Sequence, residues 1–325
     1  MKSILLFLKG IAMGAADVVP GVSGGTIAFI TGIYEELLET LSGLNFGLLK
    51  TWRKEGFKAF WTALNGNFLV VLFAGIFVSI LSLAKLIEYL LEYHPIQLWA
   101  FFFGLIIASV WLVGKTVEKW NITTIIGLIG GGITAFLITL STPAEGESAS
   151  LIYIFLCGMI AICAMILPGI SGSFILILLG AYKIILGSIS DLMSALKAGD
   201  WDLVMSNGIV IAVFIVGCVA GLISFSKLLN WLFKKAKNLI IAILTGFLIG
   251  SLNKIWPWKQ TLQFFIKHEG EPNEEIVPTV QENILPKTFE NLNGEESFLW
   301  QALIFMVIGL TLVVSLELIG KRSAK

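Results

Sequence analysis

The chain has 325 residues, of which 57% are hydrophobic and 14% charged, with 22 basic and 22 acidic residues. A soluble domain carries about 25% charged residues, so this composition excludes an ordinary soluble protein and predicts one that lies in a lipid bilayer. Zero net charge gives no electrostatic basis for binding nucleic acid. The chain contains no zinc-protease or nucleotide-binding motif, so we expect no metal, cofactor or nucleic-acid partner.

Six segments are long and apolar enough to cross a bilayer, which takes about 20 residues in a helix. In chain order they are 68–91, 97–114, 124–140, 207–233, 239–256 and 298–319. Two further apolar regions, 4–39 and 151–190, are each interrupted near the middle by a short polar sequence that breaks helices. We predict that each region forms a re-entrant hairpin, which enters the bilayer and returns on the same side; two full spans are the alternative.

The two interruptions are near copies of each other. The first motif is PGVSGGTI at residues 20–27, and the second motif is PGISGSFI at residues 168–175. Polar backbone at membrane depth is tolerated only where it is buried in protein or lines a cavity. Duplication of the motif therefore indicates one site built from two related segments. The alternative is that Gly and Ser in these motifs only allow helices to pack closely.

The repeat extends beyond the motifs. An offset of 142 residues relates Gly75 to Gly217, Gly104 to Gly246, and Ser109 to Ser251. Each half, 1–142 and 150–320, then holds one broken hairpin and three spans. Because three is odd, the second half enters the membrane from the opposite face, which is the inverted-topology repeat of many secondary transporters. The sequence thus predicts an all-α polytopic membrane protein with this repeat.

Charged residues orient the chain in the membrane. Most basic loop residues fall in segments that are cytoplasmic if the N-terminus is inside, as the positive-inside rule requires. Segment 257–297, placed outside by this arrangement, contains eight glutamates and has no counterpart in the first half. We therefore expect both termini in the cytoplasm, and we expect 257–297 to be a flexible acidic loop.

The motifs have the chemistry of a phosphate site. A helix that begins after each proline presents unpaired N–H groups, glycines allow a ligand to approach the backbone, and hydroxyl groups add donors. Such features together bind anions, phosphate above all. The candidate headgroup-binding residues are Ser23, Gly24, Gly25, Thr26, Ser171, Gly172 and Ser173.

Three charged residues in apolar segments add candidates. Asp17, just before the first motif, is a functional candidate because acids are rare inside membranes; it can carry a coupling proton, orient the motif, or simply accept hydrogen bonds from a helix start. Lys85 and Lys227 occupy matched positions and either attract an anionic headgroup or extend toward the membrane surface. Tyr34 and Tyr182 also match, and we expect them at membrane interfaces.

Residues 14–26 (GAADVVPGVSGGT), followed by Gly32-Ile33-Tyr34, resemble the N-terminal signature of the polyprenyl-phosphate transporter family PopT. Residues 161–173 (AICAMILPGISGS) resemble the second signature of this bacterial family, which was formerly a family of unknown function. The resemblance covers nearly the whole chain except 257–297. It implies a flippase in the bacterial inner membrane that returns undecaprenyl phosphate from the outer to the inner leaflet for recycling in peptidoglycan synthesis.

Two other functions compete with this one. A small-anion transporter or channel can use the same phosphate site. A lipid-pyrophosphate phosphatase needs a nucleophile with cationic support, but His94 and His268 lie in predicted loops and Arg53 and Arg322 in predicted cytoplasmic segments. We therefore expect no catalytic residues, and the sequence leaves the driving ion and the oligomeric state open.

Overall fold

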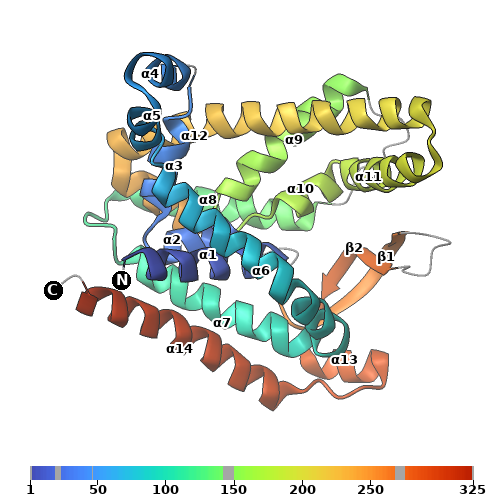
Figure 1. The fold of residues 1–325 in the computed structure, drawn as a ribbon. Coiled ribbons are helices and arrows are strands. Elements are labelled where there is room, and N and C mark those ends of the chain that lie inside the picture. The colour runs from blue at the N-terminus through green and yellow to red at the C-terminus, as the bar shows by residue number, and fades with distance from the viewer. Residues whose placement is uncertain (1, 19–22, 46, 142–149, 268–274, 324–325) are drawn as a thin grey trace.

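The computed structural model describes residues 2–18, 23–45, 47–141, 150–267 and 275–323. These residues form a mainly helical bundle with one small β-hairpin (Figure 1). The helices of the N-terminal part are α1 (Lys2–Val18), α2 (Gly24–Ile30), α3 (Tyr34–Ser42), α4 (Gly47–Glu55), α5 (Phe57–Ala63), α6 (Gly66–Tyr93), α7 (Pro95–Gly114) and α8 (Ile122–Leu140). The elements that follow are α9 (Leu151–Ile166), α10 (Gly172–Leu178), α11 (Ala181–Ala198), α12 (Trp201–Ser251), β1 (Lys259–Lys267), β2 (Glu275–Asn283), α13 (Pro286–Asn293) and α14 (Leu299–Ser323).

Four helices in the described residues, α6, α7, α8 and α12, are long and apolar enough to cross a membrane, and the bent pair α10–α11 is a fifth candidate. The prediction of a multi-pass helical membrane protein is therefore confirmed. Helix α12 unites the predicted spans 207–233 and 239–256. Its 51 residues would extend about 75 Å if straight, more than twice the ~30 Å hydrocarbon core. The helix instead turns at Ala236, where φ is −146° and ψ is 52°.

Both interrupted regions are broken at their motifs, as predicted. Helix α1 ends before the first motif and α2 begins within it, while α9 and α10 flank the break in the second motif. Each returning arm also bends a second time, at a glycine, which was not predicted from the sequence. Gly32 has φ 74° and Gly180 has φ 68°, a left-handed conformation that only glycine adopts readily. The second of these bends turns α11 by 105° from α10.

Glycines bring the long helices into close contact at matched positions. A Cβ atom at Gly75 of α6 would lie 2.3 Å from the carbonyl oxygen of Phe7 in α1, and one at Gly217 of α12 would lie 2.2 Å from that of Phe155 in α9. Helices α1 and α9 therefore pack against the partner helices in the same way. Small residues at such contacts are the usual basis of helix association in membranes.

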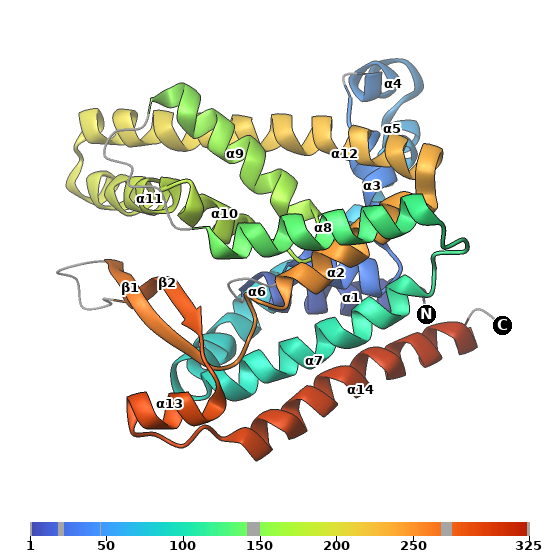
Figure 2. The same cartoon turned by 180° about the vertical axis from the view of Figure 1, so that it is seen from behind.

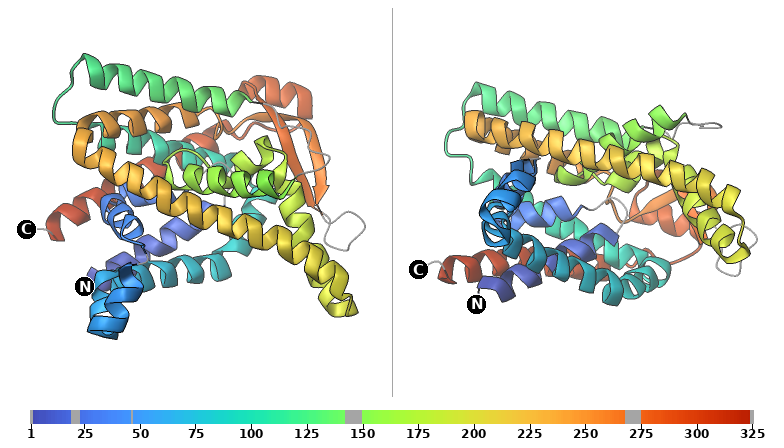
Figure 3. Two further views of the ribbon diagram at one scale, coloured as in Figure 1. Left: turned by 90° about the horizontal axis from the view of Figure 1, so that it is seen from above. Right: turned by 45° about the horizontal axis from the view of Figure 1, so that its top comes forward.

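The last long helix of each half packs against the other half. Helix α8 lies along the second part of α12, as Figure 3 shows, and α14 lies along α7, as Figure 2 shows. Glycines again permit the approach: a Cβ at Gly104 would lie 1.9 Å from the carbonyl oxygen of Met306, and one at Gly246 would lie 2.2 Å from that of Leu128. The N-terminal and C-terminal parts of the chain are therefore interlocked.

The described residues of segment 257–297 form regular structure rather than the loop that was expected. Strands β1 and β2 pair in antiparallel fashion, and α13 follows. Two tryptophans hold this segment on the bundle: Trp258 Nε1 donates to the Ser297 carbonyl at 2.8 Å, and Trp256 Nε1 donates to the Ile284 carbonyl at 2.9 Å. Trp258 packs with residues of α7 and α14 and is 2% exposed. The hairpin lies at the opposite end of the bundle from the start of α1 and the end of α14 (Figure 1).

Candidate functional site

The two motifs are in direct contact inside the bundle. The backbone N–H of Gly169 donates to Thr26 Oγ1 at 2.8 Å, and Ser23 Oγ donates to the carbonyl oxygen of Met165 at 2.9 Å. Thr26 is 0% and Ser23 1% exposed. Residues 20–22 of the first motif lie outside the described residues. Polar segments far apart in the sequence thus share one buried polar region.

Glycine is required where the motifs approach each other. A Cβ atom at Gly25 would lie 2.6 Å from the carbonyl oxygen of Ile166, at the end of α9. A Cβ at Gly24 would lie 2.5 Å from Asp17 Oδ2. Any larger side chain at either position would separate α2 from α9 or displace the Asp17 carboxylate. The glycines of the first motif therefore serve close backbone contact.

The first motif satisfies its own helix start. Gly24 N–H donates to Asp17 Oδ1 at 2.6 Å, Gly25 N–H donates to Ser23 Oγ at 3.1 Å, and Thr26 N–H donates to the Ser23 carbonyl at 2.9 Å. Of the roles considered for Asp17, the hydrogen bond to a helix start is the one observed. The carboxylate occupies the position on Gly24 N–H that an incoming anion would otherwise take.

The second motif leaves hydroxyl groups available. Ser171 is the N-cap of α10 but its side chain makes no capping bond; instead its Oγ lies 2.9 Å from Ser173 Oγ. Two hydroxyls that share one hydrogen bond retain one O–H donor. The motif is held in place by Gly169, which has φ +86° and no room for a Cβ, since that atom would lie 2.9 Å from the Phe247 carbonyl. Gly169 thus anchors the second motif, whereas the hydroxyl donor that is not used for anchoring belongs to Ser171 or Ser173.

An apolar cavity of about 610 Å³ adjoins the first motif. Its wall includes Ala15 and Ala16, which precede the first motif, and Ile27, the last residue of that motif. On the side of α7 and α14, Gln97 Nε2 donates to Gln301 Oε1 at 2.6 Å. The remaining lining residues are Ala12, Ile87, Leu90, His94, Leu98, Phe101, Phe102, Leu105, Phe305, Ile308 and Leu312. The cavity therefore lies between the two interlocked parts of the chain and is almost wholly apolar.

Of the two candidate cations, only Lys227 has a described side chain. Lys227 lies exposed on α12; Lys85 lies in α6, and its side chain is outside the described part of the structure. Sequence reasoning missed Lys9, whose Nζ donates to the Thr31 carbonyl at the end of α2 at 2.6 Å, and Lys254, beyond α12. Both stand in apolar segments, and that signal was present in the sequence.

The position of Tyr34 at a membrane interface stays a prediction, but the side chain faces the protein interior. Its side chain is 1% exposed and packs between Phe29 and Phe233, with ring centroids 5.0 and 5.9 Å away. Glycine at position 32 turns the chain immediately before α3, which brings the ring inward toward α12.

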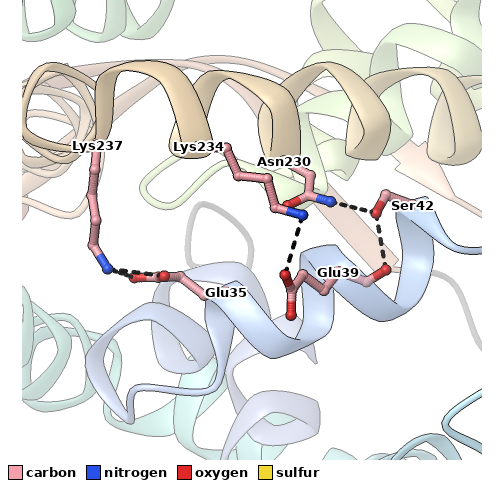
Figure 4. A network of polar contacts seen from close by, with 6 residues as sticks. All are labelled: Glu35, Glu39, Ser42, Asn230, Lys234 and Lys237. Carbon is pink, nitrogen blue, oxygen red and sulfur yellow. Dashed lines mark hydrogen bonds and ion pairs between the residues drawn. The ribbon is translucent and has the colours of Figure 1, made fainter.

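A polar network joins α3 to α12 near the turn at Ala236 (Figure 4). Lys237 Nζ lies 2.6 Å from Glu35 Oε1, and Lys234 Nζ lies 3.4 Å from Glu39 Oε1. Asn230 Nδ2 donates to Ser42 Oγ at 2.8 Å. We call these six residues, Glu35, Glu39, Ser42, Asn230, Lys234 and Lys237, the α3–α12 network.

A bundle of long apolar helices whose interior holds two contacting helix-breaking motifs beside an apolar cavity belongs to the class of multi-pass membrane transporters. Comparison with known families narrows this class to one family. Residues 13–273 match the family described as "VCA0040-like: Undecaprenyl phosphate translocase-like", and the chain belongs to that family, as its two sequence signatures predicted.

Two curated relatives bear the name polyprenyl-phosphate transporter. The one from Vibrio cholerae is 46% identical over 317 residues, which cover 98% of this chain and 97% of the relative. The one from Staphylococcus aureus is 36% identical over 261 residues, covering 77% of this chain and 85% of the relative. No solved structure matches the chain.

Proposed function

We propose that this protein transports undecaprenyl phosphate, or a closely related polyprenyl phosphate, from the outer to the inner leaflet of the bacterial inner membrane for reuse in cell-wall synthesis. The relatives' names support the substrate class. The observation that carries the proposal is the hydrogen bond between Thr26 and Gly169, because it joins the two polar motifs inside an apolar bundle, where an unpaired polar group would be costly.

The headgroup site in this proposal comprises Ser23, Gly24, Gly25, Thr26, Ser171, Gly172 and Ser173, with divided roles. Ser23 and Thr26 hold the two motifs together. Ser171 and Ser173 supply the hydroxyl groups that a phosphate oxygen can reach. Asp17 orients the first motif and gives up Gly24 N–H when the phosphate takes that donor.

The lipid tail occupies the apolar cavity of about 610 Å³ and extends into the surrounding lipid. Such a cavity suits a polyprenyl chain because burial of its apolar surface is favourable. The two halves, 1–142 and 150–320, form an inverted repeat whose relative motion exposes the headgroup site to one leaflet and then the other. The matched contacts of Gly75 with α1 and Gly217 with α9 support this repeat.

Transport in proteoliposomes tests the function. We expect the wild-type protein to move a labelled polyprenyl phosphate between leaflets, and Ser171→Ala with Ser173→Ala to lose most of this activity while remaining folded. Ser224→Ala is the matched control, because the Ser224 hydroxyl donates within its own helix, to the carbonyl oxygens of Ala220 and Gly221. Undiminished transport by the Ser171/Ser173 double variant would refute the assigned site. Uptake of inorganic phosphate without lipid movement would instead identify a small-anion transporter.

A further inference from the structure

A second cavity, of about 340 Å³, lies where the β-hairpin meets the rest of the chain. Its wall includes α8, α10, both strands and the turn that follows α12. The volume is at the lower end of the range, about 300–1,000 Å³, that small-molecule sites occupy. The apolar cavity beside the first motif shares none of these residues, so the two are separate.

Two lysines line this cavity. Lys254 places its Nζ 4.3 Å from the centroid of the Phe174 ring, and Lys259 places its Nζ 3.9 Å from that of the Trp99 ring. Lys259 Nζ also donates to the Lys254 carbonyl at 2.5 Å. Both side chains are only partly exposed. The aromatic rings of Phe174 and Trp99 stabilise the cations, and both lysines also line the cavity.

No carboxylate in the described part of the chain forms an ion pair with either lysine. Glu282 of β2 also lines the cavity, but it is exposed. Burial, together with the charge of Lys254, lowers the pKa of Lys259 well below its usual value of 10.5. Two neighbouring cations that are partly removed from water and lack a counter-ion are unfavourable, and an anion in the cavity would offset this cost.

The polar wall of the cavity is already organised. Asn253 Nδ2 donates to Thr139 Oγ1 at 2.8 Å, and Asn283 Nδ2 donates to Asn253 Oδ1 at 2.8 Å. These bonds tie the end of α8, the turn after α12 and the end of β2 together. The position of the two lysines is therefore set by three elements rather than by one flexible loop.

The cavity is also joined to the second motif. Phe174, beneath Lys254 Nζ, directly follows Ser173. Lys254 N–H donates to the Ser251 carbonyl at 2.9 Å, and Ser251 Oγ would lie 3.0 Å from a Cβ at Gly169. One turn of chain thus separates the lysine cavity from the second motif.

We propose that this cavity is a phosphate-binding site, in which Lys254 and Lys259 hold a phosphate monoester headgroup or free inorganic phosphate before the anion reaches the second motif. The proposal rests on the proposed transport function and deepens it. The lysines match the charge of a phosphate, and their ammonium groups donate charge-assisted hydrogen bonds to its oxygens.

Binding of two probes to the full-length protein in detergent tests the proposal: inorganic phosphate, and a short-chain polyprenyl phosphate. We expect Lys254→Gln and Lys259→Gln each to weaken binding about tenfold, as loss of one charge-assisted hydrogen bond does. Lys287→Gln is the control, because it removes the same charge from α13 at an exposed position and should leave binding unchanged. If the Gln variants bind both probes more weakly, the cavity is a site for the phosphate group itself. If they bind only the polyprenyl phosphate more weakly, the cavity is a site for the lipid headgroup.

A second measurement needs no variant. Phosphate should slow acetylation of Lys254 and Lys259 in the wild-type protein, but not that of Lys287, as measured by mass spectrometry. Equal acetylation rates with and without either probe, or full binding by the two Gln variants, would overturn the lysine site. Lysine-dependent phosphate binding by a protein that moves no polyprenyl phosphate would instead refute the transport function and leave the site standing.

Discussion

The contact between the two motifs can be tested by removing a single oxygen atom. Thr26→Val preserves the shape of the side chain but removes Oγ1, the acceptor of the Gly169 N–H at 2.8 Å. Because Thr26 is 0% exposed, water cannot replace the lost acceptor in the packed state. The variant therefore leaves a buried N–H group unpaired.

The expected loss of stability follows from this unpaired N–H group of Gly169. An unsatisfied buried donor costs about 1–3 kcal/mol, which corresponds to about a 5- to 150-fold change in an equilibrium constant. The total free energy of unfolding of a typical protein is about 5–15 kcal/mol, so Thr26→Val should lower the unfolding temperature measurably without preventing folding. Polyprenyl phosphate transport should fall with it, because the two motifs lose their fixed relative position.

Thr26→Ser is the matched comparison. It keeps the hydroxyl that bonds Gly169 and loses only one buried methyl group, worth about 0.8 kcal/mol. Thermal unfolding in detergent and transport in proteoliposomes should be measured for both variants. If Thr26→Val is as stable and as active as the wild type, while Thr26→Ser shows the small loss expected for a methyl group, the hydrogen bond between the motifs contributes nothing and the reasoning fails.

Three further predictions concern packing, the α3–α12 network and pH. Gly104→Ala should destabilise the protein by about 1–3 kcal/mol through overpacking. Gly130→Ala is the control and should leave stability unchanged, because a Cβ at that position meets nothing within 4 Å. Equal unfolding temperatures of the two variants would contradict the α7–α14 contact. Lys237→Glu should weaken the α3–α12 contact by about 0.2–1 kcal/mol, which is the contribution of an exposed ion pair. Adding Glu35→Lys to this variant should restore the contact, as measured by the unfolding temperatures of the single variant, the double variant and the wild type. If the double variant shows no recovery, Lys237 and Glu35 do not form a stabilising pair. Burial and the charge of Lys254 place the pKa of Lys259 well below 10.5, so Lys259 loses its charge as the pH rises through that lowered value. Phosphate binding measured by calorimetry should therefore weaken with rising pH more in the wild type than in Lys259→Gln. The same pH dependence in both proteins would contradict a role for this cation.

The breaks in the helices were predictable from the sequence because their cause is local. Pro168 and the glycines around it interrupt an apolar run, and such residues end helices whatever surrounds them. That the two motifs form one site was expected for a different reason: polar groups at membrane depth need partners or a cavity, and the motif is duplicated. The hydrogen bond between Thr26 and Gly169 itself was not predicted, because it depends on how α2 packs against the second motif. Local sequence was thus informative wherever a residue's own chemistry decided the outcome.

Segment 257–297 shows where this reasoning fails. Its many glutamates and polar residues are typical of disorder, yet it forms a hairpin and a helix. Trp256 and Trp258 decide the outcome by packing against α7 and α14, helices distant in sequence. The contact of Lys259 with Lys254 was also missed, although only five residues separate them, because it depends on the turn that follows α12. The bend at Gly180 was missed because it depends on how α11 packs against α12.

The arrangement of polar contacts defines one stage of the proposed transport cycle. In the proposed orientation, the α3–α12 network lies on the cytoplasmic side of the motifs and the lysine cavity on the outer side. Ion pairs of Lys237 and Lys234 join α3 to α12 on the inner side, whereas Lys254 and Lys259 form no ion pair with a carboxylate among the described residues. In the proposed cycle an anion would therefore bind from outside first, and we expect its release inside to require separation of α3 from α12. Gly32 and Ala236 border that contact, and their backbone conformations make them the places where α3 and α12 can turn apart.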